Sequence, residues 1–258
     1  MSFGSRTVPI SHNSDGFRDV EPVLDGRRSI MFVGDSFVWG TGLEPSARFT
    51  DKLRARHPEW ALYNCGVVGY GTDQEYLLLQ RYFQRYHPQV VFLLFCTEND
   101  FFDNCSNGGG IQIFKPYFTI GGEGLKPHGI PVPFPDYVFC QKHPYLSKPY
   151  LVRLAMRAWG NVRCPPGRPF ERGITFTLLD AVKKFVCARN AAFYVGLTTG
   201  DPELERFLEK SQTPFINLNT NLRLEGDFHW SGEGNSFVAG KIESFLKEQK
   251  VWQNGRSE

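Results

Sequence analysis

Five short runs of consecutive apolar residues recur along the chain, and each has the length of one β-strand. They are SIMFVG (29–34), ALYNCGVV (61–68), QVVFLLFCT (89–97), AAFYVGLTT (191–199) and TPFINLN (213–219). Apolar residues follow one another in these runs without regular polar alternation, which is typical of strands buried on both faces of a sheet. The pattern therefore predicts a parallel β-sheet with helices on both of its faces.

Segments with helical patterns lie between these strands. We expect one helix to run from Ser46, which is placed to cap it, to Arg56. A second begins at Thr72 or Asp73 and stops before Pro88, because proline disfavours helix in the residue before it. Two more are predicted over 175–190 and 232–250. Strands that alternate with helices form βαβ units, so the sequence predicts an α/β fold.

Residues 101–170 interrupt this alternation. The segment is rich in glycine, proline and aromatic residues and offers one helical piece, PYLVRLAMRAWG (149–160). Long irregular segments in compact domains are usually functional or mobile, and this one follows the carboxyl end of the third strand, where open α/β sheets bind ligands. We therefore predict a single domain over 1–258 with a cap insertion at 101–170. A decorative insertion packed on the sheet edge is the alternative.

Charge and hydropathy restrict the partners of the protein. The chain carries 29 Lys and Arg against 27 Asp and Glu, with no basic block, so we expect no nucleic-acid partner. No apolar run reaches the roughly 20 residues of a membrane span, and the polar start lacks the apolar core of a signal peptide. We expect no integral membrane segment and a cytoplasmic location as written, or export if the sequence has been trimmed.

The cysteines give no clear indication of a metal site. Six of them lie apart at positions 65, 96, 105, 140, 164 and 187, several within apolar runs, as is typical of buried free thiols in a reducing compartment. Only Cys140 and His143 have a metal-like spacing, and they supply half of the four ligands that structural zinc needs. We therefore expect no bound metal.

Four places in the sequence carry groups suited to nucleophilic catalysis by serine. Such catalysis requires a hydroxyl, a histidine to take its proton, an acid to orient the histidine, and donors for an oxyanion. Ser36 directly follows the first strand, Gly69 follows the second, and Asn99 ends the third. Asp227 lies two residues before His229, so that the acid can meet one ring nitrogen and leave the other for Ser36.

Each of these residues also has a purely structural interpretation. Ser36 can cap the helical turn that follows it, Gly69 can be a left-handed turn residue, and Asn99 can close its strand with an Asx-turn. Asp35 is expected to act only as a turn former that bonds nearby backbone. The joint order favours catalysis, because the carboxyl ends of successive parallel strands meet along one edge of a sheet.

That order resembles the SGNH hydrolases, also called the GDSL esterases and lipases. The blocks that carry the resemblance are GDSF (34–37), GVVGYGTDQ (66–74), TEND (97–100) and the pair Asp227 and His229. NSDGFRD (13–19) also resembles a segment that precedes the first strand in some members. The resemblance implies a three-layer α/β/α sandwich with a flavodoxin-like, five-stranded parallel sheet.

The resemblance also implies a chemistry, namely ester hydrolysis or acyl transfer through a serine acyl-enzyme without a cofactor. Ser36 is then the nucleophile, His229 the base and Asp227 the acid. The oxyanion donors are the N–H groups of Ser36 and Gly69 and the side chain of Asn99.

Three details of the blocks leave alternatives open. Thr97 stands where the third block has a glycine. The last block is one residue shorter than Asp-x-x-His because Gly226 lies three residues before His229, and this spacing resembles the alginate O-acetyltransferase-related branch. Glu225 is the alternative acid. The candidates for the oxyanion glycine are Gly69, Gly66 and Gly71.

The function that these residues favour is removal of a short, acetyl-like acyl group from a polar alcohol such as a carbohydrate. Four aromatic residues beside the motif residues are the candidates to contact this small-molecule or carbohydrate ester: Phe37, Tyr70, Phe101 and Trp230. Packing in the core is the alternative for most of them. An O-acyltransferase with the same residues is one alternative. A non-catalytic ligand-binding protein on the same fold is another.

Overall fold

The computed structural model describes residues 2–3, 6–106, 115–122, 124–132, 143, 145–146, 148–163 and 170–252. The chain divides into two compact units. The first comprises Met1–Tyr70, Leu79–Glu98 and Lys183–Glu258, and the second comprises Gly71–Leu78 and Asn99–Val182. The parallel sheet belongs to the first unit, whereas the whole of the predicted cap insertion falls in the second.

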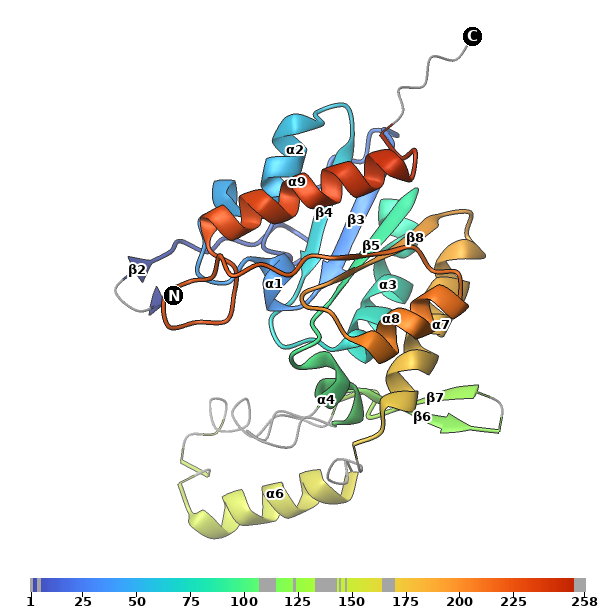
Figure 1. The fold of residues 1–258 in the computed structure, drawn as a ribbon. Helices are drawn as coiled ribbons and strands as arrows, with labels where there is room; N and C mark the ends of the chain where they lie inside the picture. The colour runs from blue at the N-terminus through green and yellow to red at the C-terminus, as the bar shows by residue number, and fades with distance from the viewer. Residues whose placement is uncertain are drawn as a thin grey trace. The chain divides into compact units, whose positions relative to one another are not determined.

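A five-stranded parallel sheet forms the centre of the first unit (Figure 1). Its strands are β3 (Ser29–Gly34), β4 (Ala61–Gly66), β5 (Val90–Phe95), β8 (Ala192–Leu197) and β9 (Phe215–Asn217). They lie in the order β4-β3-β5-β8-β9, with every pair parallel. This is the flavodoxin-like order. The five predicted strands are therefore confirmed, although all except the first are shorter than their apolar runs.

Helices cover both faces of this sheet. They are α2 (Phe49–Arg56), α9 (Gly232–Glu248) and residues 79–86 of α3 (Thr72–Tyr86), whereas most of α7 (Arg172–Cys187) belongs to the second unit. On one face Phe32 packs edge-on against Phe49 of α2, with ring centroids 5.5 Å apart, and Ile242 of α9 joins the same core cluster. On the other face the ring of Tyr63 lies 4.5 Å from that of Tyr86 in α3. Alternate residues of a strand point to opposite faces of the sheet. The apolar runs therefore provide a core on each face, and the helices and the sheet form three layers.

The predicted helix at 46–56 begins later than expected, and its predicted cap is wrong. Pro45–Ala47 form a separate 3₁₀ turn, and α2 begins at Phe49. Arg48 occupies the N-cap position with an extended backbone and no capping side chain. Its Nε instead donates to Asp51 at 2.6 Å. Ser46 therefore lies inside the preceding turn and cannot cap α2.

Helix α8 (Pro202–Lys210) was not predicted from the apolar pattern. The side chain of Asp201 caps it by accepting the N–H of Leu204 at 2.9 Å, and Pro202 occupies its first turn. Leu204 and Leu208 are fully buried. An N-cap acid followed by proline is a recognised start signal, so the sequence did contain the information.

The described part of the second unit contains a β-hairpin and helices. They are α4 (Asp100–Cys105), β6 (Tyr117–Gly121) paired antiparallel with β7 (Gly124–His128), and α6 (Tyr150–Arg163). Phe118 of the hairpin packs with Ile174 and Leu178 in a small core. The hairpin was not predicted, whereas α6 overlaps the predicted helical piece. A role as a cap stays a prediction, and 107–114, 133–142 and 164–169 lie outside the described residues.

The cysteines and the membrane prediction are tested only in the part of the chain that the structure describes. There Cys65 and Cys96 are buried free thiols, whereas Cys105 is half-buried and Cys187 is exposed. Burial raises the pKa of Cys65 well above its usual value. Cys140 and Cys164 lie outside the described residues. Among the described residues no helix has the length and apolar character needed to cross a bilayer, and no group of three or more potential metal ligands gathers.

Phe92 of β5 provides a test of the core. It is fully buried, with its ring 5.6 Å from Phe32 and 6.4 Å from Phe245. We expect Phe92→Ala to lower the free energy of unfolding by about 3–5 kcal/mol, because the removed ring leaves a cavity. Phe237→Ala, on the exposed side of α9, is the control and should cost less than about 1 kcal/mol. Equal losses in chemical denaturation would contradict this interpretation.

Candidate active site

Ser36 lies directly beyond the carboxyl end of β3 and is the first residue of the four-residue helix α1 (Ser36–Trp39). Asp35 caps this helix, because its Oδ1 accepts the N–H of Phe37 at 2.9 Å. The other carboxylate oxygen lies 3.3 Å from the hydroxyl of Ser36. Asp35 is thus the turn former that the sequence predicts, and the cap of α1 is Asp35 and not Ser36. The Ser36 hydroxyl is left to make a different contact.

That contact is with His229. The hydroxyl oxygen of Ser36 lies 2.7 Å from Nε2 of His229, and Nδ1 of the same ring lies 2.6 Å from Oδ1 of Asp227. An ionised Asp227 can only accept, so Nδ1 carries a proton and Nε2 is free to accept from the Ser36 hydroxyl. Ser36 and His229 keep 7% and 8% of their surfaces exposed. The two hydrogen bonds that join Ser36, His229 and Asp227 allow the imidazole to take the serine proton when the serine oxygen attacks an electrophile.

The electrostatics of Asp227 support this protonation pattern. Partial burial by itself raises the pKa of the carboxyl, but hydrogen bonds from the backbone N–H and the ring of His229 outweigh it. The backbone bond to Oδ1 is 3.0 Å long. The net effect places the pKa of Asp227 below its ordinary value, so the carboxylate is ionised at neutral pH.

A tight hairpin explains how an acid only two residues from the histidine reaches its ring. The N–H of Asp227 donates to the carbonyl of Leu224 at 3.1 Å, and the N–H of Leu224 donates to the carbonyl of His229 at 2.8 Å. Gly226 is the third residue of the turn and has φ +69°, a conformation that favours glycine. The longer Asp-x-x-His block has its acid three residues before the histidine. In this chain Gly226 takes that position, because the third residue of the turn needs a left-handed conformation. Glu225 lies exposed at the tip.

A set of polar contacts that the sequence analysis missed holds this hairpin to the strand ends. The guanidinium of Arg223 donates to the carbonyl of Phe228, and its Nη2 lies 3.4 Å from Oε1 of Glu98. Glu98 also accepts from Thr198, and the N–H of Thr97 donates to Thr198 at 3.0 Å. Thr97, in place of a glycine, thus ties the end of β5 to the end of β8. No local sequence signal identifies these partners, because they lie about a hundred residues apart.

The three candidate oxyanion glycines have different surroundings. Gly69 has φ +75° in a turn closed by the N–H of Tyr70 and the carbonyl of Val67, and a Cβ there would meet nothing within 4 Å. A Cβ on Gly66 would lie 2.3 Å from the backbone nitrogen of Trp39, so Gly66 is required for packing of α1. Gly71 belongs to the second unit. The left-handed turn expected as the structural role of Gly69 is present, and its N–H as a donor stays a prediction.

Asn99 and Phe101 belong to the second unit. Asn99 precedes α4, its Nδ2 donates to Asp103 at 2.9 Å, and its buried Oδ1 has no partner among the described residues. The side-chain oxygen therefore does not close an Asx-turn. Phe101 is buried against Phe176 and Arg172. Their roles toward a substrate stay predictions.

Two of the aromatic residues expected to contact a substrate belong to the core of the first unit. Phe37 and Trp230 are 2% and 1% exposed and pack on each other with ring centroids 4.7 Å apart. We therefore assign these two side chains to core packing and not to substrate contact. Tyr70 is half-buried, and burial raises its pKa. Phe228, which was not predicted, is 47% exposed with its ring 4.2 Å from that of His229.

Comparison with known proteins gives matches in structure only. No family model matches the sequence, and no curated protein matches it. The psychrotrophic esterase EstA from Pseudoalteromonas, solved with monoethylphosphonate as inhibitor, is 13% identical, with a TM-score of 0.51 over 87% of this chain and 99% of its own. A member of the lipolytic G-D-S-L family from Veillonella parvula is 11% identical, with a TM-score of 0.50 over 85% and 98%.

A third solved structure is a two-domain esterase active on acetylated mannans. It is 12% identical with a TM-score of 0.50 over 87% of this chain, which matches half of that longer chain. At such identities the likeness concerns the fold. The chain therefore has the fold of the SGNH or GDSL hydrolases, as the motif order implied.

Gly226 provides a test of the hairpin that needs no substrate. We expect Gly226→Val to break the bond between Nδ1 of His229 and Asp227, because a left-handed conformation costs a branched residue at least about 1–2 kcal/mol. The downfield proton resonance of the ring N–H should disappear. Gly226→Asn is the matched control and should keep the resonance, since asparagine tolerates this conformation. Retention of the resonance in Gly226→Val would show that the turn does not depend on glycine.

Proposed function

We propose that this chain is a serine ester hydrolase of the SGNH type that removes a short, acetyl-like acyl group from a polar alcohol such as a carbohydrate. The observation that carries the proposal is the unbroken hydrogen-bond path from Ser36 through His229 to Asp227, with contacts of 2.7 and 2.6 Å. A ligand-binding module has no need of this path. The fold shared with known esterases is consistent with it but does not carry it, since one fold hosts many functions.

The geometry supports a two-step mechanism. Oγ of Ser36 attacks the ester carbonyl carbon while its proton passes to Nε2 of His229, and Asp227 stabilises the imidazolium that forms. Collapse of the tetrahedral intermediate breaks the bond to the alcohol oxygen, which takes the proton from Nε2. Water then gives a proton to Nε2 and attacks the acyl-enzyme, and collapse releases the carboxylic acid while Nε2 returns the proton to Oγ of Ser36.

Three donors are proposed for the oxyanion. The N–H of Ser36 has no acceptor within α1, because it is the first residue of the helix. The N–H of Gly69 lies in an open left-handed turn that leaves room for a close approach. The side-chain amide of Asn99 is proposed from the motif alone. Loss of one such donor typically lowers kcat about 10²- to 10³-fold.

The proposed substrate class rests on the residues beside Ser36 and on two of the structural neighbours. The exposed ring of Phe228 offers an apolar surface next to the reacting imidazole, as aromatic rings do when they stack on sugars or cover small acyl groups. The neighbour active on acetylated mannans acts on a carbohydrate ester, and EstA is inhibited by monoethylphosphonate. A phosphonate that mimics the tetrahedral intermediate is therefore a suitable probe for Ser36.

The first experiment is hydrolysis of p-nitrophenyl esters from acetyl to octanoyl. We expect activity that falls with chain length and that drops at least about 10³-fold in Ser36→Ala, because the nucleophile is lost. Phosphonate should label the unmodified chain and not the variant. An O-acyltransferase shares the acyl-enzyme, so it would be recognised by label on Ser36 with acyl transfer to an added alcohol faster than to water. Absence of both hydrolysis and label would favour the binding-protein alternative and overturn the proposal.

Two variants of one loop test which carboxylate is the acid. We expect Asp227→Ala to lower kcat about 10²- to 10⁴-fold, since the imidazole loses the partner that sets its tautomer. Glu225→Ala removes an acid of the same hairpin that lies exposed at its tip, and should change kcat less than about twofold. The reverse result in ester hydrolysis would transfer the role to Glu225.

A further inference from the structure

The helix that carries Ser36 is too short to be stable by itself. α1 is a single turn of four residues, all of them buried, and isolated helices shorter than about 12 residues are marginal in water. The last carbonyl groups of any helix have no partner within it. In a buried helix they need donors from elsewhere in the protein.

The guanidinium of Arg18 supplies a donor to the last of these carbonyl groups, that of Trp39, and to two more in the chain that follows α1. Its Nη1 donates to the carbonyl of Gly40 at 2.7 Å and to that of Trp39 at 3.3 Å, and its Nη2 donates to the carbonyl of Leu43 at 2.6 Å. The guanidinium also lies over the indole of Trp39, with Cζ 4.4 Å from the ring centroid. Arg18 is 3% exposed. The side chain of Arg18 thus fixes the carbonyl groups of Trp39, at the end of α1, and of Gly40 and Leu43, in the chain that follows.

These contacts reach Ser36 through two peptide units, Trp39–Gly40 and Gly40–Thr41, whose carbonyl groups accept from Arg18. The N–H of Gly40 donates to the carbonyl of Ser36 at 3.0 Å, and the N–H of Thr41 donates to the same carbonyl at 3.1 Å. Gly40 is therefore held by Arg18 at its carbonyl and holds Ser36 by its N–H. A shift of Gly40 changes the position of Ser36 relative to His229.

The segment NSDGFRD (13–19) holds Arg18 in place. Oδ1 of Asn13 accepts the N–H groups of Asp15 and Phe17 at 3.1 and 3.0 Å, and Gly16 has φ +87°. The buried ring of Phe17 packs edge-on against Tyr82 with centroids 4.9 Å apart. A compact turn anchored in the core therefore precedes Arg18.

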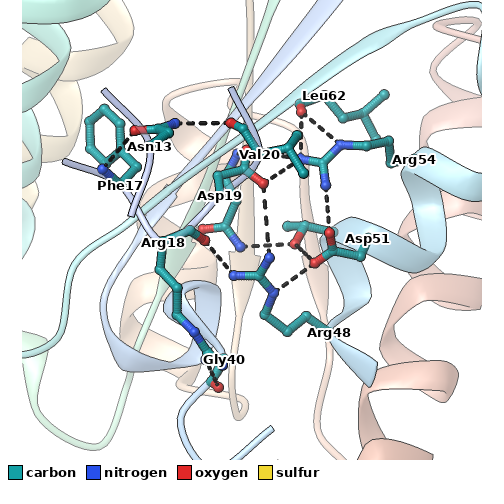
Figure 2. Close-up of polar contacts among 12 residues, drawn as sticks. Asn13, Phe17, Arg18, Asp19, Val20, Gly40, Arg48, Asp51, Arg54 and Leu62 are labelled. Atoms are coloured by element: carbon teal, nitrogen blue, oxygen red, sulfur yellow. Dashed lines mark hydrogen bonds and ion pairs between the residues drawn. The ribbon is translucent and has the colours of Figure 1, made fainter. Parts of the chain in front are cut away.

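A partly buried charge cluster (Asp19, Arg48, Asp51 and Arg54) lies beside Arg18, and Arg48 of this cluster bonds the Arg18 backbone. Arg48 donates to the carbonyl of Arg18 and to Asp51, and Arg54 donates to both oxygens of Asp19 at 2.7 and 2.9 Å. Figure 2 shows the side chain of Arg18 leaving this cluster toward Gly40. Arg48 thus holds the carbonyl of Arg18, while the guanidinium of Arg18 holds the chain after α1.

We propose that Arg18 is a positioning residue for Ser36, which sets the distance of the Ser36 hydroxyl from Nε2 of His229 by fixing the carbonyl groups of Trp39, Gly40 and Leu43. Arg18 touches neither Ser36 nor His229, so it acts through α1. The catalytic part of this inference rests on the proposed function. A misplacement of about 1 Å at a reacting group can cost about 10²-fold in rate.

The test compares Arg18 with Arg54, which belongs to the charge cluster and bonds the carbonyl of Leu62 but no carbonyl of α1. The variants are Arg18→Lys, Arg18→Met, Arg54→Lys and Arg54→Met. Each is measured for kcat and KM with p-nitrophenyl acetate, for the rate of phosphonate labelling of Ser36, and for Tm. All rates are taken at a temperature where every variant is folded.

We expect Arg18→Met and Arg18→Lys to lower kcat and the labelling rate about 10- to 100-fold with KM changed less than about threefold. Lysine keeps the charge but cannot form the fork to three carbonyls. The matched Arg54 variants should lower Tm with kcat within about twofold of the unmodified chain. Unchanged kcat in a folded Arg18→Lys, or an equal kcat loss in Arg54→Lys, would overturn the proposal. If Arg18→Met does not fold, the lysine pair decides.

Amide hydrogen exchange separates failure of this inference from failure of the proposed function. In Arg18→Lys the amides of Gly40 and Thr41 should exchange at least about 10-fold faster, whereas Arg54→Lys should leave them unchanged. This result does not depend on activity. A chain that hydrolyses no ester but shows this exchange would retain Arg18 as the residue that positions Ser36 and lose the esterase assignment. Unchanged exchange in Arg18→Lys would overturn the inference for an active enzyme as well.

Discussion

The close approach of α1 to the ends of β3 and β4 is the constraint on which the site depends. Gly34 and Gly66 are neighbours in the ladder between these strands. A Cβ on Gly34 would lie 2.4 Å from a methyl carbon of Val38, and one on Gly66 would lie 2.3 Å from the nitrogen of Trp39. Since neither glycine has a positive φ, the reason for glycine here is space and not a turn. Any side chain would lift α1, and with it Ser36, away from the sheet.

Because α1 packs closely on the strand ends, its carbonyl groups are buried and need polar partners from the protein. Asn64, in β4, donates to the carbonyl of Val38 at 2.7 Å and accepts the N–H of Gly66 through its side-chain oxygen at 3.1 Å. Gly40 has φ +81° and lies against the alkyl stem of Arg48, where a Cβ would be 2.4 Å from Cδ. The helix thus has glycine contacts on the strand side and a polar partner for each carbonyl described above. A dry apolar core alone would leave those carbonyls without donors.

The sequence predicted those parts of the fold that have local signals. Apolar runs located all five strands of the sheet, because strands buried on both faces contain few polar residues. The start of α2 was wrong because Pro45 begins a turn of its own, and α8 was missed although Asp201 and Pro202 announce it. The hairpin of β6 and β7 has no such pattern, since one of its strands contains both glycine and proline.

For the site, the motif order predicted the contacts of Ser36, His229 and Asp227 but not what holds these side chains. Ser36, His229 and Asp227 are hydrogen-bonded in a row, as their order along the chain suggested. Phe37 and Trp230 lie in the core instead, where their apolar rings pack on each other. The roles of Arg18 and Arg223 were not predicted, because no local sequence pattern relates an arginine to carbonyl groups that the fold brings near it.

The hairpin at Gly226 has a consequence for the entropy of assembling the site. Asp227 and His229 lie two residues apart, so formation of the turn by itself brings the acid and the base together. Only the contact between Ser36 and His229, which are 193 residues apart, depends on the long intervening chain. The entropy of closing a loop grows slowly with its length. The chain between them is therefore free to vary in length at small entropic cost. The orientation of the imidazole remains a local property of the hairpin between Arg223 and Trp230.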